Sequence, residues 1–158
     1  MNRFTATATG INVYLADTEI AILGRLVNLL GGAGVENDDP AARRLRPVIY
    51  ADDATASREF DRLAAKERVE ARSADAERFA DGLRTAVKGI LSLNSEDASA
   101  WARVLGESRI VLAARKGLFE SGLPDKRPED PEVALVMYMG ILQEELVAEM
   151  LATMEDNE

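Results

Sequence analysis

Apolar residues recur every three or four positions along most of this sequence, which is the spacing of one face of an α-helix. The clearest such stripe comprises Trp101, Val104, Leu105, Ser108, Val111 and Leu112. Two further stripes comprise Ile20, Leu23, Leu26, Val27 and Leu30, and then Ala76, Phe79, Leu83, Val87, Ile90 and Leu91. A chain of 158 residues is long enough to bury one core. We therefore predict a mainly α fold, a single-domain helical bundle of five to six helices spanning residues 1–158.

Residues 3–15 show a different period. Ile11, Val13 and Leu15 alternate with Asn12 and Tyr14, as in a half-buried strand. We predict a small N-terminal β-hairpin at 3–15, helices over 16–154, and a frayed tail at 155–158. A lone hairpin is marginal in water, so it must pack on the helices or on another chain.

Capping residues mark where the helices begin and end. The predicted N-caps are Asp17, Asp52, Ser95 and Asp130, and Pro131 takes the first helical position after the last of these. Gly31 and Gly117 are predicted to end helices. The pattern leaves open whether residues 53–92 form one helix or two helices with a break near Ser73.

The composition excludes several kinds of active site. The chain has no cysteine and no histidine, so it can form neither a disulfide nor a thiolate zinc site. Serine–histidine and cysteine–histidine catalysis within one chain are also excluded. Only Asp, Glu, Lys and Tyr remain for proton transfer, and we expect no cofactor.

The charge of the chain bears on its partners. The net charge is −9 at pH 7, which opposes general nucleic-acid binding because phosphate neutralisation dominates that affinity. Residues 41–88 differ, with 11 Lys and Arg against 9 Asp and Glu, a net of +2. No apolar run has transmembrane length, and the N-terminus lacks the apolar region of a signal peptide. We expect a cytoplasmic protein that binds no membrane.

Several short pieces of sequence follow one another in a specific order. They are the N-terminal hairpin, Thr18-Glu19 on the first helix, Asp39-Pro40, Arg44-Leu45-Arg46-Pro47 with Tyr50, Glu59-Phe60, Trp101, Arg109-Ile-Val-Leu112, Arg115 and Gln143-Glu-Glu-Leu146-Val147. This order resembles the actinobacterial DUF2017 family, a domain of unknown function. The resemblance covers nearly the whole chain. It departs from the family at Gly106-Glu107-Ser108-Arg109, where the family usually has Asn-Asp-Leu-Arg, and at Ala113-Ala114-Arg115, where the family has Gly-Thr-Arg.

What the resemblance implies is a cytoplasmic, mostly helical protein with no assigned activity. Genes of the family tend to lie beside that of the ClpS-type protease adaptor, and some relatives carry the label of transcriptional regulator. The resemblance therefore implies regulated proteolysis as a natural setting.

Arginines, prolines and a tyrosine interrupt the helical pattern between Asp39 and Asp53. One interpretation is a surface that binds a partner protein, because guanidinium groups bind carboxylates and phosphates well. The residues proposed for this surface are Arg43, Arg44, Arg46, Tyr50, Arg58 and Arg62. The other interpretation is a structural clasp in which the arginines pair with Asp52, Asp53 and Glu59. The clasp is the favoured one, because structural ion pairs outnumber binding sites.

Four more charged residues are predicted to form structural ion pairs: Glu59, Glu107, Arg109 and Arg115. Arg58, Arg62 and Lys66 are spaced four residues apart, and acidic neighbours favour a solvated, salt-bridged helix face over a DNA-binding one. Glu107 is predicted to form a partly buried ion pair with an arginine, and such pairs more often specify packing than catalyse.

Carboxylates at helical spacing could bind a divalent metal. Glu67 and Glu70 share one helix face, and Glu145 and Glu149 share another. A magnesium-dependent all-α hydrolase uses clusters of that kind. The di-iron bundle pattern is absent because it requires histidine, and we predict no metal site.

The last helix is apolar on nearly every side, including Met137, Tyr138, Met139, Met150 and Met154. A helix of this kind is normally central to a bundle or covered by a partner, so we expect a homodimer. The leading hypothesis is a non-enzymatic interaction or regulatory protein that also binds another protein. The alternative is a transcription-associated regulator, and the third hypothesis is a carboxylate-metal-dependent hydrolase.

Overall fold

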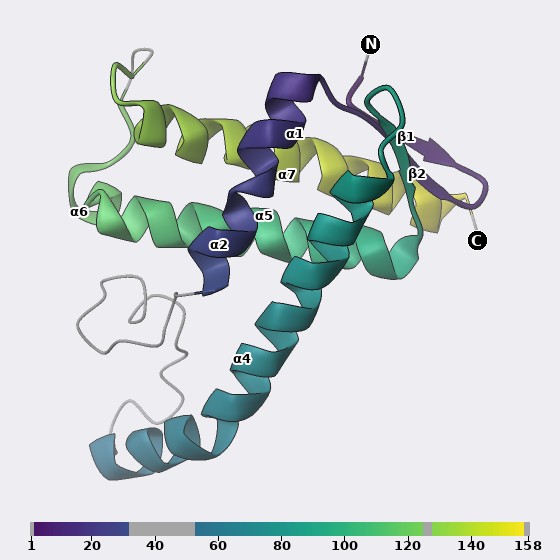
Figure 1. The fold of residues 1–158 in the computed structure, drawn as a ribbon. Coiled ribbons are helices and arrows are strands. Elements are labelled where there is room, and N and C mark those ends of the chain that lie inside the picture. The colour runs from purple at the N-terminus through teal and green to yellow at the C-terminus, as the bar shows by residue number, and fades with distance from the viewer. Residues whose placement is uncertain (1, 32–52, 125–127, 157–158) are drawn as a thin grey trace.

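The computed structural model describes residues 2–31, 53–124 and 128–156. In chain order the elements are β1 (Phe4–Thr7), β2 (Gly10–Tyr14), α1 (Asp17–Gly24), α2 (Leu26–Gly31), α4 (Ala54–Thr85), β3 (Ile90–Leu93), α5 (Ser95–Arg115), α6 (Leu118–Ser121) and α7 (Pro131–Glu155). Within those residues the fold has six helices and three short strands, so the prediction of a mainly α fold is confirmed (Figure 1). None of these helices is both long enough and apolar enough to span a bilayer.

The predicted N-terminal hairpin forms, and a third strand extends it. The sheet has the order β1-β2-β3, with both pairs antiparallel. Val13 lies opposite Phe4 on one side and Leu91 on the other. One face of the sheet is buried, with Phe4, Ile11, Val13, Leu91 and Leu93 all in the core. The sheet thus covers one end of the helical layers.

Strand β3 corrects the prediction that Val87, Ile90 and Leu91 continue a helical stripe. Helix α4 ends at Thr85, and Val87 pairs with Ile90 across a tight turn. Lys88 and Gly89 in that turn have φ angles of 53° and 78°, a region that favours glycine. The chain therefore reverses, and Leu91 and Leu93 point into the core at the period of a strand.

The predicted single helix over 17–30 is two short helices. Helix α1 ends at Gly24, Arg25 separates it from α2, and the N-cap of α1 is Ala16 in place of the predicted Asp17. The Glu19 side chain accepts a hydrogen bond from the Ala16 amide at 2.8 Å, which satisfies a free donor at the helix start. This bond fixes where the chain turns from the sheet into α1.

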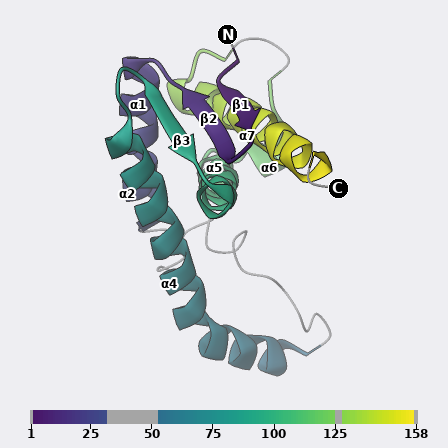
Figure 2. The same ribbon diagram turned by 90° about the vertical axis from the view of Figure 1, so that its right-hand side faces the viewer.

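Helix α4 settles the question left open by the sequence, because it runs unbroken for 32 residues. Its N-cap is Asp53, one residue after the predicted Asp52, and Asp53 accepts bonds from the amides of Thr55 and Ala56. The C-terminal part of α4 packs on α5, whereas its N-terminal turns extend away from the other described elements (Figure 2). Phe79, in the packed part, is fully buried.

Helices α5 and α7 run antiparallel, side by side, and form the main layer of the fold (Figure 1). The N-cap of α5 is Asn94, not the predicted Ser95, whereas Asp130 caps α7 as predicted. All six residues of the predicted Trp101 stripe are buried. The Trp101 ring lies 4.4 Å from the Phe79 ring, centroid to centroid, which joins α5 to α4.

Candidate functional site

The predicted partner-binding residues fall in two places. Arg43, Arg44, Arg46 and Tyr50 lie outside the described residues. Arg58 and Arg62 are exposed on the first turns of α4. Arg62 lies 3.6 Å from Glu59, and Arg58 donates a 3.5 Å hydrogen bond to Thr55. Contacts this exposed contribute little to stability.

Glu107 forms a partly buried ion pair that joins two helices. Its Oε2 accepts a hydrogen bond from Arg72 Nε of α4 at 2.8 Å. The two side chains are only 13% and 28% exposed, for arginine and glutamate respectively. This pair connects the middle of α4 to α5 at a place where the surrounding packing shields it from water.

Arg109 takes part in a reciprocal contact between α5 and α7. Its Nη1 lies 3.0 Å from where a Cβ on Gly140 would be, and Gln143 of α7 lies over Gly106 of α5 in the same way. Gln143 also donates a 3.3 Å hydrogen bond to the Ala102 carbonyl. Gly140 leaves room for the Arg109 side chain, and Gly106 leaves room for the Gln143 side chain. Gly106, which departs from the family pattern, therefore has a role in packing.

Arg115, the last of the four residues predicted to form ion pairs, lies in the final turn of α5. A cation there interacts favourably with the carbonyl end of the helix.

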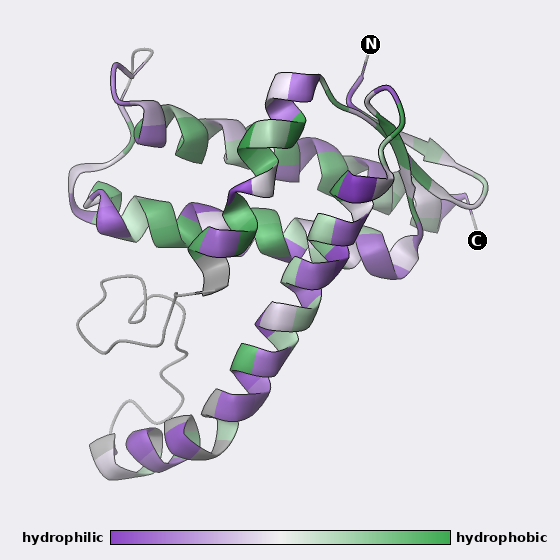
Figure 3. Cartoon of the chain, in the orientation of Figure 1, coloured by the Kyte–Doolittle hydropathy of each residue, from purple (hydrophilic) through white to green (hydrophobic). Residues whose placement is uncertain are grey.

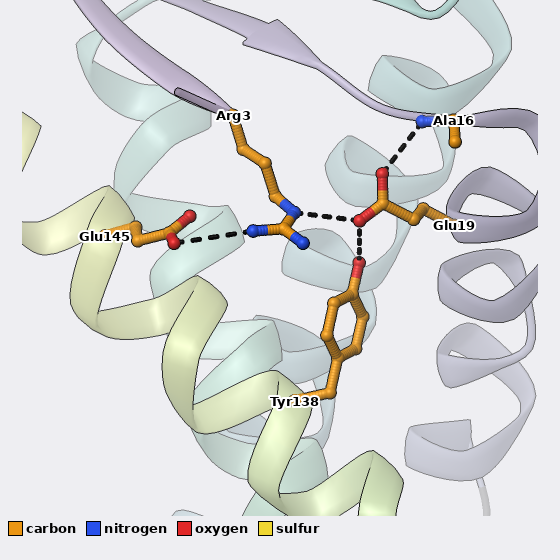
Figure 4. A network of polar contacts seen from close by, with 5 residues as sticks. All are labelled: Arg3, Ala16, Glu19, Tyr138 and Glu145. Atoms are coloured by element: carbon orange, nitrogen blue, oxygen red, sulfur yellow. Dashed lines mark hydrogen bonds and ion pairs between the residues drawn. The ribbon is translucent and has the colours of Figure 1, made fainter. Parts of the chain in front are cut away.

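A polar network joins three distant parts of the chain (Figure 4). Arg3 Nε and the Tyr138 hydroxyl both donate to Glu19 Oε1, at 2.8 and 2.7 Å. The Arg3 guanidinium also lies 5.7 Å from the centroid of the Tyr138 ring and 3.4 Å from Glu145. The network ties the start of β1 and the first turn of α1 to the middle of α7.

The network moves the pKa values of Arg3, Glu19 and Tyr138 away from neutrality. Burial opposes ionisation of Glu19, but hydrogen bonds from Ala16, Arg3 and Tyr138 outweigh it and hold the Glu19 pKa below its usual value. Burial and the bond to the Glu19 carboxylate raise the pKa of Tyr138 far above its usual value. A general acid or base works best with a pKa near the working pH. The shifted pKa values of Glu19 and Tyr138 therefore favour a structural role for this network.

Three of the four glutamates considered for metal binding contact other groups. Glu145 accepts from Arg3, and Glu149 Oε2 accepts from the Ala6 amide of β1 at 2.8 Å. Glu70 lies 3.8 Å from Lys66 on an exposed face. The described ranges contain no group of three or more acidic side chains arranged to hold a metal ion.

Helix α7 has two different faces. Its inner face is buried in the core through Val136, Met139, Leu142 and Leu146. Its outer face exposes four large apolar side chains: Ile141 at 52%, Val147 at 38%, Leu151 at 55% and Met154 at 67%. By contrast, α4 is mostly hydrophilic along its length (Figure 3). We call the exposed residues from Ile141 to Glu155 the outer face of α7.

A pocket of about 690 Å³ lies where α7 ends. The hairpin tip from Ala6 to Ile11 forms one wall, the first turn of α5 forms another, and Met150, Thr153 and Met154 of α7 form the third. Met154 belongs both to the pocket and to the outer face. The exposed apolar surface therefore continues into a recess large enough for a side chain or a small ligand.

The sequence did not indicate the Arg3–Glu19–Tyr138 network, because Glu19 and Tyr138 are 119 positions apart. One local signal was available. Glu19 stands three residues after Ala16, the spacing of a capping box, although the usual Ser or Thr is absent. The pairing of Glu107 with Arg72 had no such signal.

Comparison with families of known sequence gives one result. The model of the family described as a domain of unknown function, DUF2017, matches residues 1–150. Comparison with curated proteins and with solved structures gives no match. Since the matched residues cover nearly the whole chain, the protein belongs to the DUF2017 family.

Proposed function

We propose that this protein is a non-enzymatic interaction protein and binds another protein through the outer face of α7. The observation that carries the proposal is the exposure of Ile141, Leu151 and Met154, each more than half exposed, on the helix whose other face builds the core. Grouped apolar side chains on a soluble surface commonly mark an interaction site.

The pocket beside the outer face supports the same proposal. Binding energy in protein interfaces is concentrated in a few anchor side chains that enter recesses. Met150 and Met154 line this recess, and methionine adapts its shape to what it contacts. A regulatory role, including one in regulated proteolysis, remains part of the proposal and rests on the family resemblance.

Co-purification from the native host tests the proposal. One bait carries Ile141→Gln with Leu151→Gln. The matched control carries Val69→Gln with Leu123→Gln, which are exposed apolar residues at 47% and 58%, away from the outer face. A protein that depends on the outer face should be recovered with wild type and control, and at least about tenfold less with the outer-face bait, as for loss of an interface anchor.

The complex should then reform from the two purified proteins. Equal recovery by both double variants, or a bound protein that fails to reform the complex, would contradict the proposal.

A further inference from the structure

We propose that the partner presents a cationic amphipathic helix, with a lysine or arginine placed opposite Glu144. This inference rests on the proposed function and adds the chemistry of the partner. It is argued from the spacing of the outer face, from the position of one carboxylate, and from the charge of α7.

The spacing of the outer face matches a helical partner. Ile141, Glu144, Ala148, Leu151 and Glu155 follow one another at intervals of three and four residues, and all five are exposed. Val147 and Met154 flank this line. Alternating intervals of three and four are the contact pattern of two packed helices, in which side chains of one helix enter spaces on the other.

Glu144 stands inside this line, between Ile141 and Ala148. A helix that covers the line would take the Glu144 carboxylate out of water. An unpaired carboxylate is costly to bury, whereas one that is hydrogen-bonded to a cation can be accommodated. The covering helix must therefore carry a base at that position, with apolar residues on either side for Ile141 and Leu151.

A second copy of α7 cannot supply that base. Helix α7 contains five glutamates and no lysine or arginine. A parallel pairing can place Glu144 against Glu144, and every antiparallel pairing places it against an uncharged or acidic residue. The charge pattern of α7 therefore points to a different protein as the occupant of this face.

Two other occupants fit less well. Helix α4 of another copy offers Arg62 and Lys66, but these already face Glu59 and Glu70 of their own helix. Such a head-to-tail contact would also build a closed ring or an open chain of many copies. An anionic lipid surface would be repelled by Glu144 and Glu155, because such surfaces attract basic segments.

Site-specific photo-cross-linking in the native host tests the inference. A photo-reactive phenylalanine analogue replaces Ala148, which is exposed between Glu144 and Leu151. The same analogue at Val69 on α4 is the control. The cross-linked peptides are then sequenced. The expected product joins position 148 to a segment of another protein with lysine or arginine among apolar residues at helical spacing.

The outcomes separate the two proposals. If position 148 gives no protein product above the Val69 control, the proposed function itself fails. A product with this chain's own α7 or α4, or with an acidic or uncharged segment, would leave a protein-binding face but overturn the inference about its partner.

A charge exchange completes the test. Glu144→Lys should weaken binding of the cross-linked protein by roughly tenfold or more, because it opposes like charges in the interface. Glu67→Lys, at an exposed site on α4, should leave binding unchanged. Exchange of the partner's base for glutamate should restore binding to Glu144→Lys. If the exchanged partner does not bind Glu144→Lys while both proteins remain folded, the proposed pairing of Glu144 with the partner's base is wrong.

Discussion

Trp101 lies directly against Gly82, so that a Cβ on residue 82 would stand 2.9 Å from Cζ2 and 3.0 Å from Nε1 of the indole. Trp101 is almost fully buried, and the buried Phe79 ring packs directly against the indole, so the indole has little room to move aside. The glycine is the reason that α4 can approach α5 closely enough to bury the tryptophan. A helix interior otherwise disfavours glycine.

Gly82→Ala should therefore destabilise the protein. Helix propensity alone would make alanine more stable by about 1 kcal/mol, but overpacking against a rigid ring costs about 1 to 3 kcal/mol. We expect a net loss of up to about 2 kcal/mol in the free energy of unfolding, measured in urea. Gly24→Ala is the control, because a Cβ there meets nothing within 4 Å. Equal effects of the two changes would contradict this packing.

Tyr138→Phe should change how stability depends on alkaline pH. The Tyr138 pKa is raised from its ordinary value of 10.0 in the folded protein. The unfolded state thus releases the proton first, so the stabilisation is complete below about pH 10 and is lost as pH rises above it. Tyr138→Phe has no hydroxyl to ionise at this position, so its free energy of unfolding should not show this loss.

Urea unfolding at neutral pH and at several values above pH 10 measures the effect. At neutral pH the variant should be about 1.5 to 3 kcal/mol less stable, since it lacks one hydrogen bond to a carboxylate. Above pH 10 the difference in the free energy of unfolding between wild type and variant should decrease. If this difference stays constant or increases, the Tyr138 pKa is not raised in the folded protein, and the hydrogen bond to the Glu19 carboxylate is not as described.

Glu107→Gln should cost more than Glu59→Gln, although both changes remove one charge from an ion pair. The Arg72–Glu107 pair is largely shielded, whereas both members of the Arg62–Glu59 pair are mostly exposed at 73% and 63%. We expect a loss of roughly 1 to 2 kcal/mol for Glu107→Gln and almost none for Glu59→Gln. Urea unfolding of both variants and of the double variant checks the difference. A larger loss of stability in Glu59→Gln than in Glu107→Gln would contradict the claim that the Arg72–Glu107 pair is the more stabilising one.

Ser108→Ala should leave stability unchanged or raise it. The Ser108 hydroxyl is fully buried in α5 and has no hydrogen-bond partner among the described residues. Removal of an unsatisfied buried hydroxyl relieves a desolvation cost of about 1 kcal/mol. Ser92→Ala is the comparison, because the exposed Ser92 donates a 2.8 Å hydrogen bond to Asn12. The Tm of Ser108→Ala in thermal unfolding should equal or exceed that of wild type. A clear decrease in Tm would show that the Ser108 hydroxyl does make a stabilising hydrogen bond.

Helices α5 and α7 were predictable because their signals are local. The Trp101 stripe has the period of a buried helix face, and Asp130 with Pro131 marks a helix start within two residues. Gly117 has a φ of 66° just after α5, as expected of a residue that ends a helix. None of these features requires a contact with a distant segment.

Strand β3 was not predictable in the same way. Ile90 and Leu91 fit the helical period of Phe79 and Leu83, and only Gly89 signals a break. The strand is stabilised by β2, which lies more than 75 positions earlier in the chain, so no local window contains both partners. Tertiary pairing overrides local period here.

The candidate site was predictable only in part. The apolar excess of α7 was evident, but a helix that is apolar on all sides does not show which face will be exposed. The fold decides this by placing Leu142 and Leu146 in the core and leaving Ile141 and Leu151 outside. The network around Glu19 depends on three segments that meet only in the folded chain.

The central claim is that α7 uses its inner face for folding and keeps its outer face for a partner. The most direct test is the dissociation constant of the purified partner for Leu151→Gln and for Leu123→Gln. These leucines are almost equally exposed, at 55% and 58%, but only Leu151 lies on the outer face. We predict that Leu151→Gln weakens binding by about tenfold and that Leu123→Gln does not change it. Equal affinity of both variants would contradict the claim.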